Sequence, residues 1–296
     1  MDLADIATCA QLACILEVSA PKPGNVNRMH DFSDTKFEHF ASSGVAIGAP
    51  VYAAARQGFM AGKGEINLED IGVGRLIKEA VFRTSKWQNG KNTNLGISML
   101  LIPVAASAGM SLAKGDGLCE YIDSIIRAAT YQDTLDLYEA IRHANPGGLG
   151  SSGHLDVNDP HSDKKIEEKQ ISLHEIMKDT PNDSIARELV TSYDISFNIG
   201  YPALMKARKN SDVSSSVVSA YLTILSRVPD TLIRRKNGME ISRKVSMDAR
   251  SVLKGELDIE EFDMGLRSSS NHLNPGTTAD LVTTSLMISL LEGMRP

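Results

Sequence analysis

The chain is patterned for helices almost throughout. Apolar residues recur every three to four positions, and no run alternates between apolar and polar side chains in the way that is typical of strands. Prolines, glycines and capping residues set the expected helix ends, and a bend is expected at Pro50. The pattern predicts an all-α protein built as a single large helical bundle domain over residues 1–296. The expected helices span residues 3–18, 37–59, 67–87, 94–110, 118–129, 134–143, 173–178, 183–209, 213–227, 231–253, 259–267 and 277 onward.

One connection in this pattern is unusually long. The run Asn145-Pro146-Gly147-Gly148-Leu149-Gly150 is too rich in glycine for a regular element, and a charged stretch follows it. Ser172 and Glu175 have the spacing of a capping box, so one short helix is expected over 173–178. We therefore predict a long Gly/Pro-rich and charged loop near 144–182, which is typical of a lid, a binding loop or a disordered excursion.

The uncharged run 95–113 approaches the length of a membrane span. It contains Pro103, Gly109 and several Ser and Ala residues, which favours a buried helix over a membrane-spanning one. Asp2 and Asp5 stand where a secretory signal would carry basic residues. Cys9, Cys14 and Cys119 form no Cys-x-x-Cys pair and are interpreted as buried thiols in a reducing compartment. The expectation is a cytoplasmic protein with no membrane partner.

Composition narrows the partners further. Hydrophobic residues make up 42% of the 296 residues and charged residues 23%, which is ordinary for a globular protein, while the low aromatic content of 5% favours packed helices. The net charge of −6 argues against nucleic-acid binding. Any anion site must therefore be a local concentration of donors or bases. The sequence contains no P-loop, no G-x-S-x-G and no dinucleotide-binding fingerprint.

One local basic concentration does exist. Residues 230–255 carry seven basic and three acidic side chains, and Arg234-Arg235-Lys236 packs three bases into one turn near Asp230. Guanidinium groups suit phosphate oxygens, and a nearby Asp can hold a divalent cation that bridges the same phosphates. The later bases Arg243, Arg250 and Lys254 are better explained as a solvated helix face.

Three turns of similar composition open or close apolar helices. In 274–281, Thr277 or Thr278 can cap the last helix and Asp280 lies in its first turn. A buried helix N-terminus offers free N–H groups and a positive dipole end, which is a ready anion site. The other two turns are 21–26, with Lys22 fixed between prolines and followed by Asn25, and 92–96, where Thr93 or Asn94 can cap. Each turn alone is explained by helix capping or termination, but together they suggest a phosphate-handling pocket.

Taken jointly, these turns and the segment 229–236 resemble the triphosphoribosyl-dephospho-coenzyme A synthase family. The Pro146–Gly150 run with Asp156-Val157 further resembles a branch of that family found in archaea and methylotrophs. The resemblance implies an all-α transferase that moves the 5-triphosphoribosyl group of ATP onto a ribose hydroxyl of dephospho-coenzyme A and releases adenine. Mg²⁺ is the cofactor expected with ATP.

The resemblance also implies residue roles. Asp280 and Asp230 are the candidate catalytic carboxylates, one of which would stabilise a sugar-cation-like transition state or remove the hydroxyl proton. Either could instead position Mg²⁺ on the triphosphate. The residues expected to bind phosphate or ribose groups are Lys22, Asn25, Asn92, Asn94, Arg234, Arg235, Asn274, Gly276, Thr277 and Thr278.

The chain also departs from the family pattern. Asn94 and Leu95 stand where the bacterial enzymes carry His and Lys, and Asn274 and Thr277-Thr278 replace Ser and Gly-Ser. Losing a cation at Leu95 suggests a different acceptor or a differently held phosphate. Three alternatives therefore stay open: the same donor chemistry on a methanopterin-type precursor, a (phospho)ribosyl hydrolase, and a non-catalytic nucleotide-binding or carrier-interacting protein.

Overall fold

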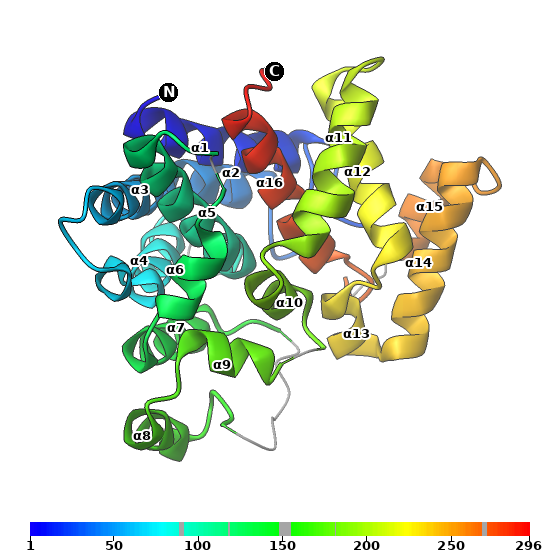
Figure 1. The fold of residues 1–296 in the computed structure, drawn as a ribbon. Coiled ribbons are helices and arrows are strands. Elements are labelled where there is room, and N and C mark those ends of the chain that lie inside the picture. The colour runs from blue at the N-terminus through cyan, green and yellow to red at the C-terminus, as the bar shows by residue number, and fades with distance from the viewer. Residues whose placement is uncertain (89–91, 118, 148–154, 181, 268–270) are drawn as a thin grey trace. The chain divides into compact units, whose positions relative to one another are not determined.

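A computed structural model describes residues 1–88, 92–117, 119–147, 155–180, 182–267 and 271–296. Within these ranges the chain is helical and contains no strand, only an isolated bridge between Asn27 and His30, which confirms the all-α prediction (Figure 1). The chain divides into two compact units. Unit 1 comprises Met1–Leu12 and Ser42–Tyr193, and unit 2 comprises Ala13–Ala41 and Asp194–Pro296. The organisation of 1–296 as a single domain stays a prediction.

The helices fall into the two units in chain order, and two of them contribute residues to both: α1 (Leu3–Ser19) and α2 (Phe37–Ala46). Unit 1 further contains α3 (Gly48–Gly62), η1 (Leu68–Ile71), α4 (Val73–Ser85), α5 (Leu95–Lys114), α6 (Ile122–Ala128), α7 (Tyr131–Ala144), α8 (Pro160–Lys169), α9 (Leu173–Lys178) and α10 (Ser184–Val190). Unit 2 further contains η2 (Ser196–Gly200), α11 (Tyr201–Arg208), α12 (Val213–Arg227), α13 (Thr231–Asn237), α14 (Met239–Lys254), α15 (Ile259–Leu266) and α16 (Gly276–Leu291).

The core of unit 1 forms around α5, which is buried from Ile97 to Ser111. Its length and mean hydropathy of 1.8 would suffice to cross a membrane, but 83% of that apolar window is buried inside the protein. The prediction of a buried core helix is therefore confirmed. Helix α3 packs closely against α5, because a Cβ at Gly58 would lie only 1.8 Å from the carbonyl oxygen of Ala106. Gly109 mirrors this contact, at 1.9 Å from the carbonyl oxygen of Ala55.

In unit 2 the buried helix is α16, whose residues from Leu281 to Leu291 are all buried. Helices α11 and α12 pack against it, and α14 packs against α12. The five-residue π-helix η2 also contacts α16, where a Cβ at Gly200 would meet the Ser285 hydroxyl at 2.0 Å. The absence of a side chain at Gly200 thus leaves room for the Ser285 hydroxyl.

Four expected helices are interrupted in the structure. The expected helix 67–87 is broken at Gly72, whose φ of 68° separates η1 from α4. The predicted bend at Pro50 is wrong, because the break comes at Ile47 and Pro50 sits in the first turn of α3, where its missing N–H costs no hydrogen bond. The expected helix 183–209 is broken after α10, where Ser192 and Tyr193 adopt left-handed φ values of 55° and 66°. The expected helix 231–253 is broken at Gly238, whose φ of 89° favours glycine.

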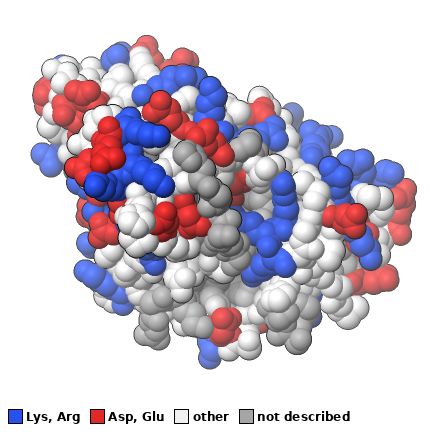
Figure 2. Space-filling view, turned by 90° about the horizontal axis from the view of Figure 1, so that it is seen from below, with Lys and Arg blue, Asp and Glu red and all other residues white. Residues whose placement is uncertain are grey.

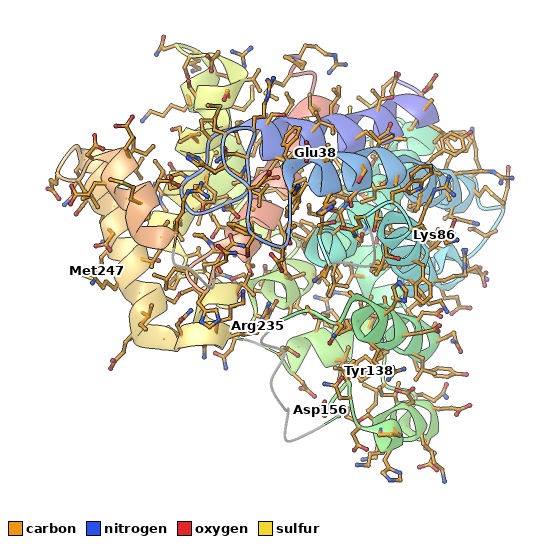
Figure 3. The ribbon with its side chains drawn as sticks, turned by 180° about the vertical axis from the view of Figure 1, so that it is seen from behind. Glu38, Lys86, Tyr138, Asp156, Arg235 and Met247 are labelled. Carbon is orange, nitrogen blue, oxygen red and sulfur yellow. The ribbon has the colours of Figure 1, made fainter. Side chains whose placement is uncertain are left out.

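The loop predicted near 144–182 is partly wrong. The short helix α9 is present with its Ser172–Glu175 capping box, but α8 also forms there, capped by Asp159 and begun by Pro160. Two contacts tie this region to α7. Tyr138, labelled in Figure 3, donates to the carbonyl oxygen of Leu155 at 2.6 Å, and Arg142 makes an ion pair with Asp163. The glycine-rich run 148–153 lies outside the described residues.

Candidate functional site

The start of α16 is held by a carboxylate from another element. The predicted cap by Thr277 or Thr278 is wrong: the N-cap position is Pro275, and Asp230 accepts from both the backbone N–H of Thr278 at 2.7 Å and its hydroxyl at 2.8 Å. These two bonds use Oδ2. The other oxygen, Oδ1, accepts from the N–H groups of Leu232 and Ile233 at 2.8 and 3.0 Å. One side chain therefore caps α13 and α16 together.

This arrangement bears directly on the catalytic and metal roles expected of Asp230. The residue is 2% exposed, and its four donors occupy the lone-pair positions that a carboxylate offers. Burial raises the pKa of Asp230, while the hydrogen bonds from Ile233, Thr278 and Leu232 act in the opposite direction. The geometry thus favours a structural role, and the catalytic and metal roles of Asp230 stay predictions without geometric support.

The backbone amides expected to cradle an anion at this helix start are mostly engaged. The Gly276 N–H donates to the carbonyl oxygen of Asn274 at 2.9 Å, and the Thr278 N–H is held by Asp230. The Thr277 hydroxyl accepts from that of Thr231 at 3.2 Å. Gly276, Thr277 and Thr278 therefore first serve to join the two helices, and their binding role stays a prediction.

Lys22 lies inside unit 2 instead of facing solvent. Its side chain is fully buried, and Nζ lies 3.1 Å from Oε1 of Glu17 and 3.3 Å from the carbonyl oxygen of Ala20. It also donates to the Glu17 carbonyl oxygen, so the ammonium closes the C-terminal turn of α1. Burial lowers the pKa of Lys22 and raises the pKa of Glu17, and the ion pair opposes both shifts. The phosphate contact predicted for Lys22 would require this pair to open.

Asn25 connects the turn 21–26 to the turn 274–281. Its Nδ2 donates to the Tyr221 hydroxyl at 2.8 Å and reaches the carbonyl oxygen of Pro275 at 3.5 Å. The Tyr221 hydroxyl donates in turn to the carbonyl oxygen of Pro23 at 2.7 Å. The two turns that the sequence singled out separately therefore meet around one buried tyrosine.

Two residues at the end of α15 hold the turn 21–26 in place. Asp263 accepts from the Gly24 N–H at 2.7 Å and pairs with Arg267 at 2.7 Å, and Arg267 donates to the carbonyl oxygen of Asn25 at 2.9 Å. Sequence reasoning missed Tyr221, Asp263 and Arg267. The i, i+4 spacing of Asp263 and Arg267 is a signal for a helical ion pair, but nothing in the sequence connects that pair to the loop.

Asp280 differs from Asp230 in its burial. Asp280 is only partly buried. It lies near Cys14, because its charge contributes to the raised pKa of the Cys14 thiol, after burial and the charge of Glu17. Just before the helix, Oδ1 of Asn274 is buried and receives no hydrogen bond from the described residues. A carboxylate and an open acceptor thus lie at the start of the same helix.

The basic turn lies on α13, directly after Asp230. Arg234 is partly buried, and Arg235, labelled in Figure 3, is exposed. Burial and the neighbouring charge of Arg235 lower the pKa of Lys236. Figure 2 shows Lys and Arg side chains in several groups, with Asp and Glu side chains beside them. The phosphate contacts predicted for Arg234 and Arg235 stay predictions.

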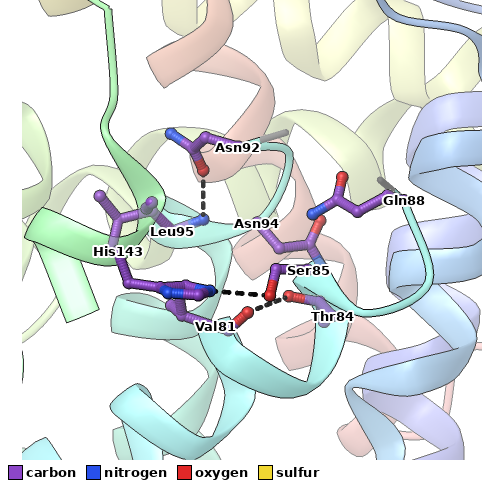
Figure 4. A pocket seen from close by; sticks show the side chains of 9 residues that line it. Val81, Thr84, Ser85, Gln88, Asn92, Asn94, Leu95 and His143 are labelled. Carbon is purple, nitrogen blue, oxygen red and sulfur yellow. Dashed lines mark hydrogen bonds between the residues drawn. The ribbon is translucent and has the colours of Figure 1, made fainter. Parts of the chain in front are cut away.

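Asn92 and Asn94 belong to unit 1, where they line a pocket at the start of α5 (Figure 4). The prediction that Asn94 stands at the N-cap position of α5 is confirmed, but its side chain makes no cap bond. Asn92 supplies the cap instead, accepting from the Leu95 N–H at 3.1 Å. The pocket is lined by Val81, Thr84, Ser85, Gln88, Asn92, Asn94, Leu95, His143 and Ala144.

The residues present fit Mg²⁺ only in a limited way. In the described ranges no group of three or more His, Cys, Asp and Glu side chains could hold a metal ion. Mg²⁺ commonly binds through one or two carboxylates together with substrate phosphates. Asp230 already accepts four hydrogen bonds, so the partly exposed Asp280 stays the predicted ligand for such a site.

Comparison with known proteins decides the family. The profile of the CitG family, described as ATP:dephospho-CoA triphosphoribosyl transferase, matches residues 3–296. The chain belongs to this family. The fold and the transferase class expected from the four motifs are thereby confirmed.

Relatives of the CitG family resemble the chain over nearly its full length. A protein of Streptococcus equi subsp. zooepidemicus named for 2-(5''-triphosphoribosyl)-3'-dephosphocoenzyme-A synthase is 26% identical over 304 residues, covering 97% of each chain. A protein of Streptococcus pyogenes serotype M18 with the same name is 24% identical, covering 98% of this chain and 97% of its own. A crystal structure named for triphosphoribosyl-dephospho-CoA synthase from Archaeoglobus fulgidus is 29% identical with a TM-score of 0.65, covering 88% of this chain and all of that one.

Proposed function

We propose that this CitG-family protein transfers the 5-triphosphoribosyl group of ATP to a ribose hydroxyl of dephospho-coenzyme A, with release of adenine. The family match over residues 3–296 carries the proposal, and the relatives' names point to dephospho-coenzyme A as the acceptor. The comparisons give no support to a pterin precursor as acceptor or to a hydrolase.

The chemistry requires a group that stabilises positive charge on the ribose or accepts the hydroxyl proton. Asp280 fits this role because it is partly exposed and lies beside the turn that carries Asn274. The open Oδ1 of Asn274 fits a ribose hydroxyl, since a hydroxyl would supply the donor that this buried oxygen lacks among the described residues. Asp230, Asn25, Tyr221 and Arg267 act as positioning residues that hold these turns.

Phosphate binding is the second requirement. Arg234 and Arg235 follow directly on Asp230 in α13, and a guanidinium group binds phosphate oxygens through two parallel hydrogen bonds. When Mg²⁺ is bound, it would supply charge neutralisation to the triphosphate, with the partly exposed Asp280 as the proposed protein ligand.

The test is a product assay with purified protein, ATP, Mg²⁺ and dephospho-coenzyme A, in which adenine is quantified and the acceptor product is identified by mass. Asp280→Asn is expected to lower adenine release about 10²–10⁴-fold, the usual contribution of a positioned acid–base group. Asp212→Asn is the matched control, because Asp212 is an exposed carboxylate that caps α12 and asparagine keeps a cap.

The outcomes separate the alternatives. Adenine release without any acceptor would favour a hydrolase. Adenine release only with a pterin precursor would identify that precursor, and not dephospho-coenzyme A, as the acceptor. ATP binding with no adenine release under any condition would overturn the transferase proposal.

A further inference from the structure

Two neighbouring helices of unit 2, α14 and α15, expose side chains of opposite charge (Figure 1). Each helix presents two adjacent charged residues and a methionine three and four positions after them. These exposed residues are Arg243, Lys244 and Met247 on α14, the basic face, and Glu260, Glu261 and Met264 on α15, the acidic face. Because residues three and four positions apart lie on the same side of a helix, each set forms one surface.

In the described ranges, the four charged side chains of these faces form no ion pair, although other charges on the two helices are engaged. Lys254 pairs with Glu256 at 3.6 Å, and Arg250 donates to a backbone carbonyl oxygen of α12 at 3.0 Å. The Asp258 carboxylate caps α15. Glu240 lies in the first turn of α14, where an acid stabilises the positive helix end. The basic and acidic faces therefore keep charges that this chain itself leaves unpaired.

The methionine of each face is open to solvent. Met247, labelled in Figure 3, is 66% exposed, and Met264 is 69% exposed. Exposed apolar side chains rimmed by polar ones mark interaction sites, and methionine and arginine are enriched where proteins meet. Each face thus has the composition of a small docking surface with one sign of charge.

We propose that a second copy of this chain docks here, with the basic face of each copy against the acidic face of the other. A twofold axis forms both contacts at once, because each copy carries both faces. The equal spacing of charges and methionine on the two helices lets ion pairs and methionine contacts form together.

Other classes of partner fit only one of the two faces. An acidic protein or a nucleic acid would be attracted by Arg243 and Lys244 but repelled by the neighbouring acidic face. A basic protein would be attracted by Glu260 and Glu261 but repelled by the basic face. Like charges brought together weaken an association, so a second copy is the partner that matches both faces. The proposal does not depend on the proposed function.

The first experiment uses the unaltered full chain. Sedimentation velocity is expected to show a monomer–dimer equilibrium whose association constant falls at least about tenfold between about 50 mM and 500 mM salt, because salt screens exposed charges. A chain that stays monomeric up to about 1 mM protein at low salt would overturn the proposal. A dimer whose affinity does not change with salt would overturn it as well.

Charge reversal then locates the interface. The basic-face variant Arg243→Glu/Lys244→Glu and the acidic-face variant Glu260→Lys/Glu261→Lys each place like charges against each other, twice in a symmetric dimer. Each variant alone is expected to associate at least about tenfold more weakly than the wild type. Mixing the two should restore a dimer that contains one chain of each, because every basic helix then faces an acidic one.

Net charge alone would not produce this recovery. The chain's charge of −6 becomes −6 − 4 = −10 in the basic-face variant and −6 + 4 = −2 in the acidic-face variant, so the mixed chains still repel each other overall. The matched control is Lys206→Glu/Lys209→Glu, which also gives −10 by reversing two exposed lysines at the end of α11. It should dimerise like the wild type and should not restore association of the acidic-face variant.

The outcomes are read on variants whose circular dichroism spectra match the wild type. Folded reversal variants that dimerise as tightly as the wild type, or that fail to associate when mixed, would overturn the proposal. Equal loss of association in the control would overturn it too, because the effect would then come from net charge.

Discussion

At the scale of single residues, the two aspartates that look alike in sequence have different environments. Asp230 has all its acceptor positions filled by donors from the starts of α13 and α16, while Asp280 lies partly exposed on α16. The division follows from hydrogen-bond capacity: a carboxylate that already accepts four bonds has little left for a proton or a metal ion. Asp230 is therefore expected to act through position and Asp280 through contact with substrate.

Asp230→Asn tests this division. Asparagine replaces one acceptor oxygen with a donor, so either the Thr278 groups or the amides of Leu232 and Ile233 lose their partner. The expected cost is about 1–3 kcal/mol of unfolding free energy, measured by urea denaturation. The control Asp258→Asn changes a carboxylate that accepts from two backbone amides at the exposed start of α15, and it should cost clearly less.

Activity distinguishes positioning from catalysis for Asp230. If the residue only positions, adenine release per folded molecule should fall much less in Asp230→Asn than in Asp280→Asn. An Asp230→Asn protein of unchanged stability but with no turnover would instead establish a catalytic role.

At the scale of elements, the sequence predicted helix existence well and helix ends poorly. Helix α12 begins and ends as expected because Asp212 and the following apolar pattern agree, and α9 forms where Ser172 and Glu175 mark it. The helix break at Ser192 and Tyr193 contains no Gly or Pro, so the local sequence does not predict it. A tertiary hydrogen bond from the Tyr193 hydroxyl to the carbonyl oxygen of Leu100 stabilises the break instead. Local patterns cannot reveal such long-range compensation.

The same limit applies to the candidate site. The motifs drew attention to Lys22, Asn25, Asn274 and Asp280, yet the sequence could not show that Lys22 pairs internally with Glu17. Capping partners distant in sequence, such as Asp230 for Thr278, are also invisible to local rules. Residue type and spacing thus predicted where the turns lie, but not which distant residues hold them by hydrogen bonds.

The packing of α3 on α5 gives a prediction at this scale. Gly58→Ala places a methyl group 1.8 Å from the carbonyl oxygen of Ala106, so the helices must separate. Overpacking of this kind is expected to cost about 1–3 kcal/mol of unfolding free energy or more, measured by urea or thermal denaturation. Gly265→Ala is the control: this helical glycine has open space at its Cβ, and alanine there should be neutral or stabilising. Equal stability of both variants would show that the α3–α5 contact is not as close as described.

At the scale of the whole molecule, ionisable groups are buried in the cores of both units. Burial raises the pKa of the Tyr193 hydroxyl in unit 1 and of Cys14 and the Tyr221 hydroxyl in unit 2. A group whose pKa is higher in the folded protein contributes stability that is fully present below its unfolded pKa. That contribution is lost as the pH rises toward the folded value. The unfolding free energy should therefore fall progressively above about pH 9, where unfolded cysteine and then tyrosine begin to ionise.

Tyr138 allows part of this fall in unfolding free energy at alkaline pH to be assigned to one side chain. Burial, reinforced by the charges of Asp163 and Asp156, raises the pKa of Tyr138 from 10.0 to about 12, and its hydroxyl donates to the carbonyl oxygen of Leu155. Its contribution is then complete below pH 10 and declines as the pH approaches 12. Urea denaturation at several pH values from 8 to about 11.5 should show a stability difference between wild type and Tyr138→Phe that narrows with rising pH. A difference that stays constant over this range would contradict the prediction. It would mean that the Tyr138 hydroxyl has the same pKa in the folded and unfolded chains.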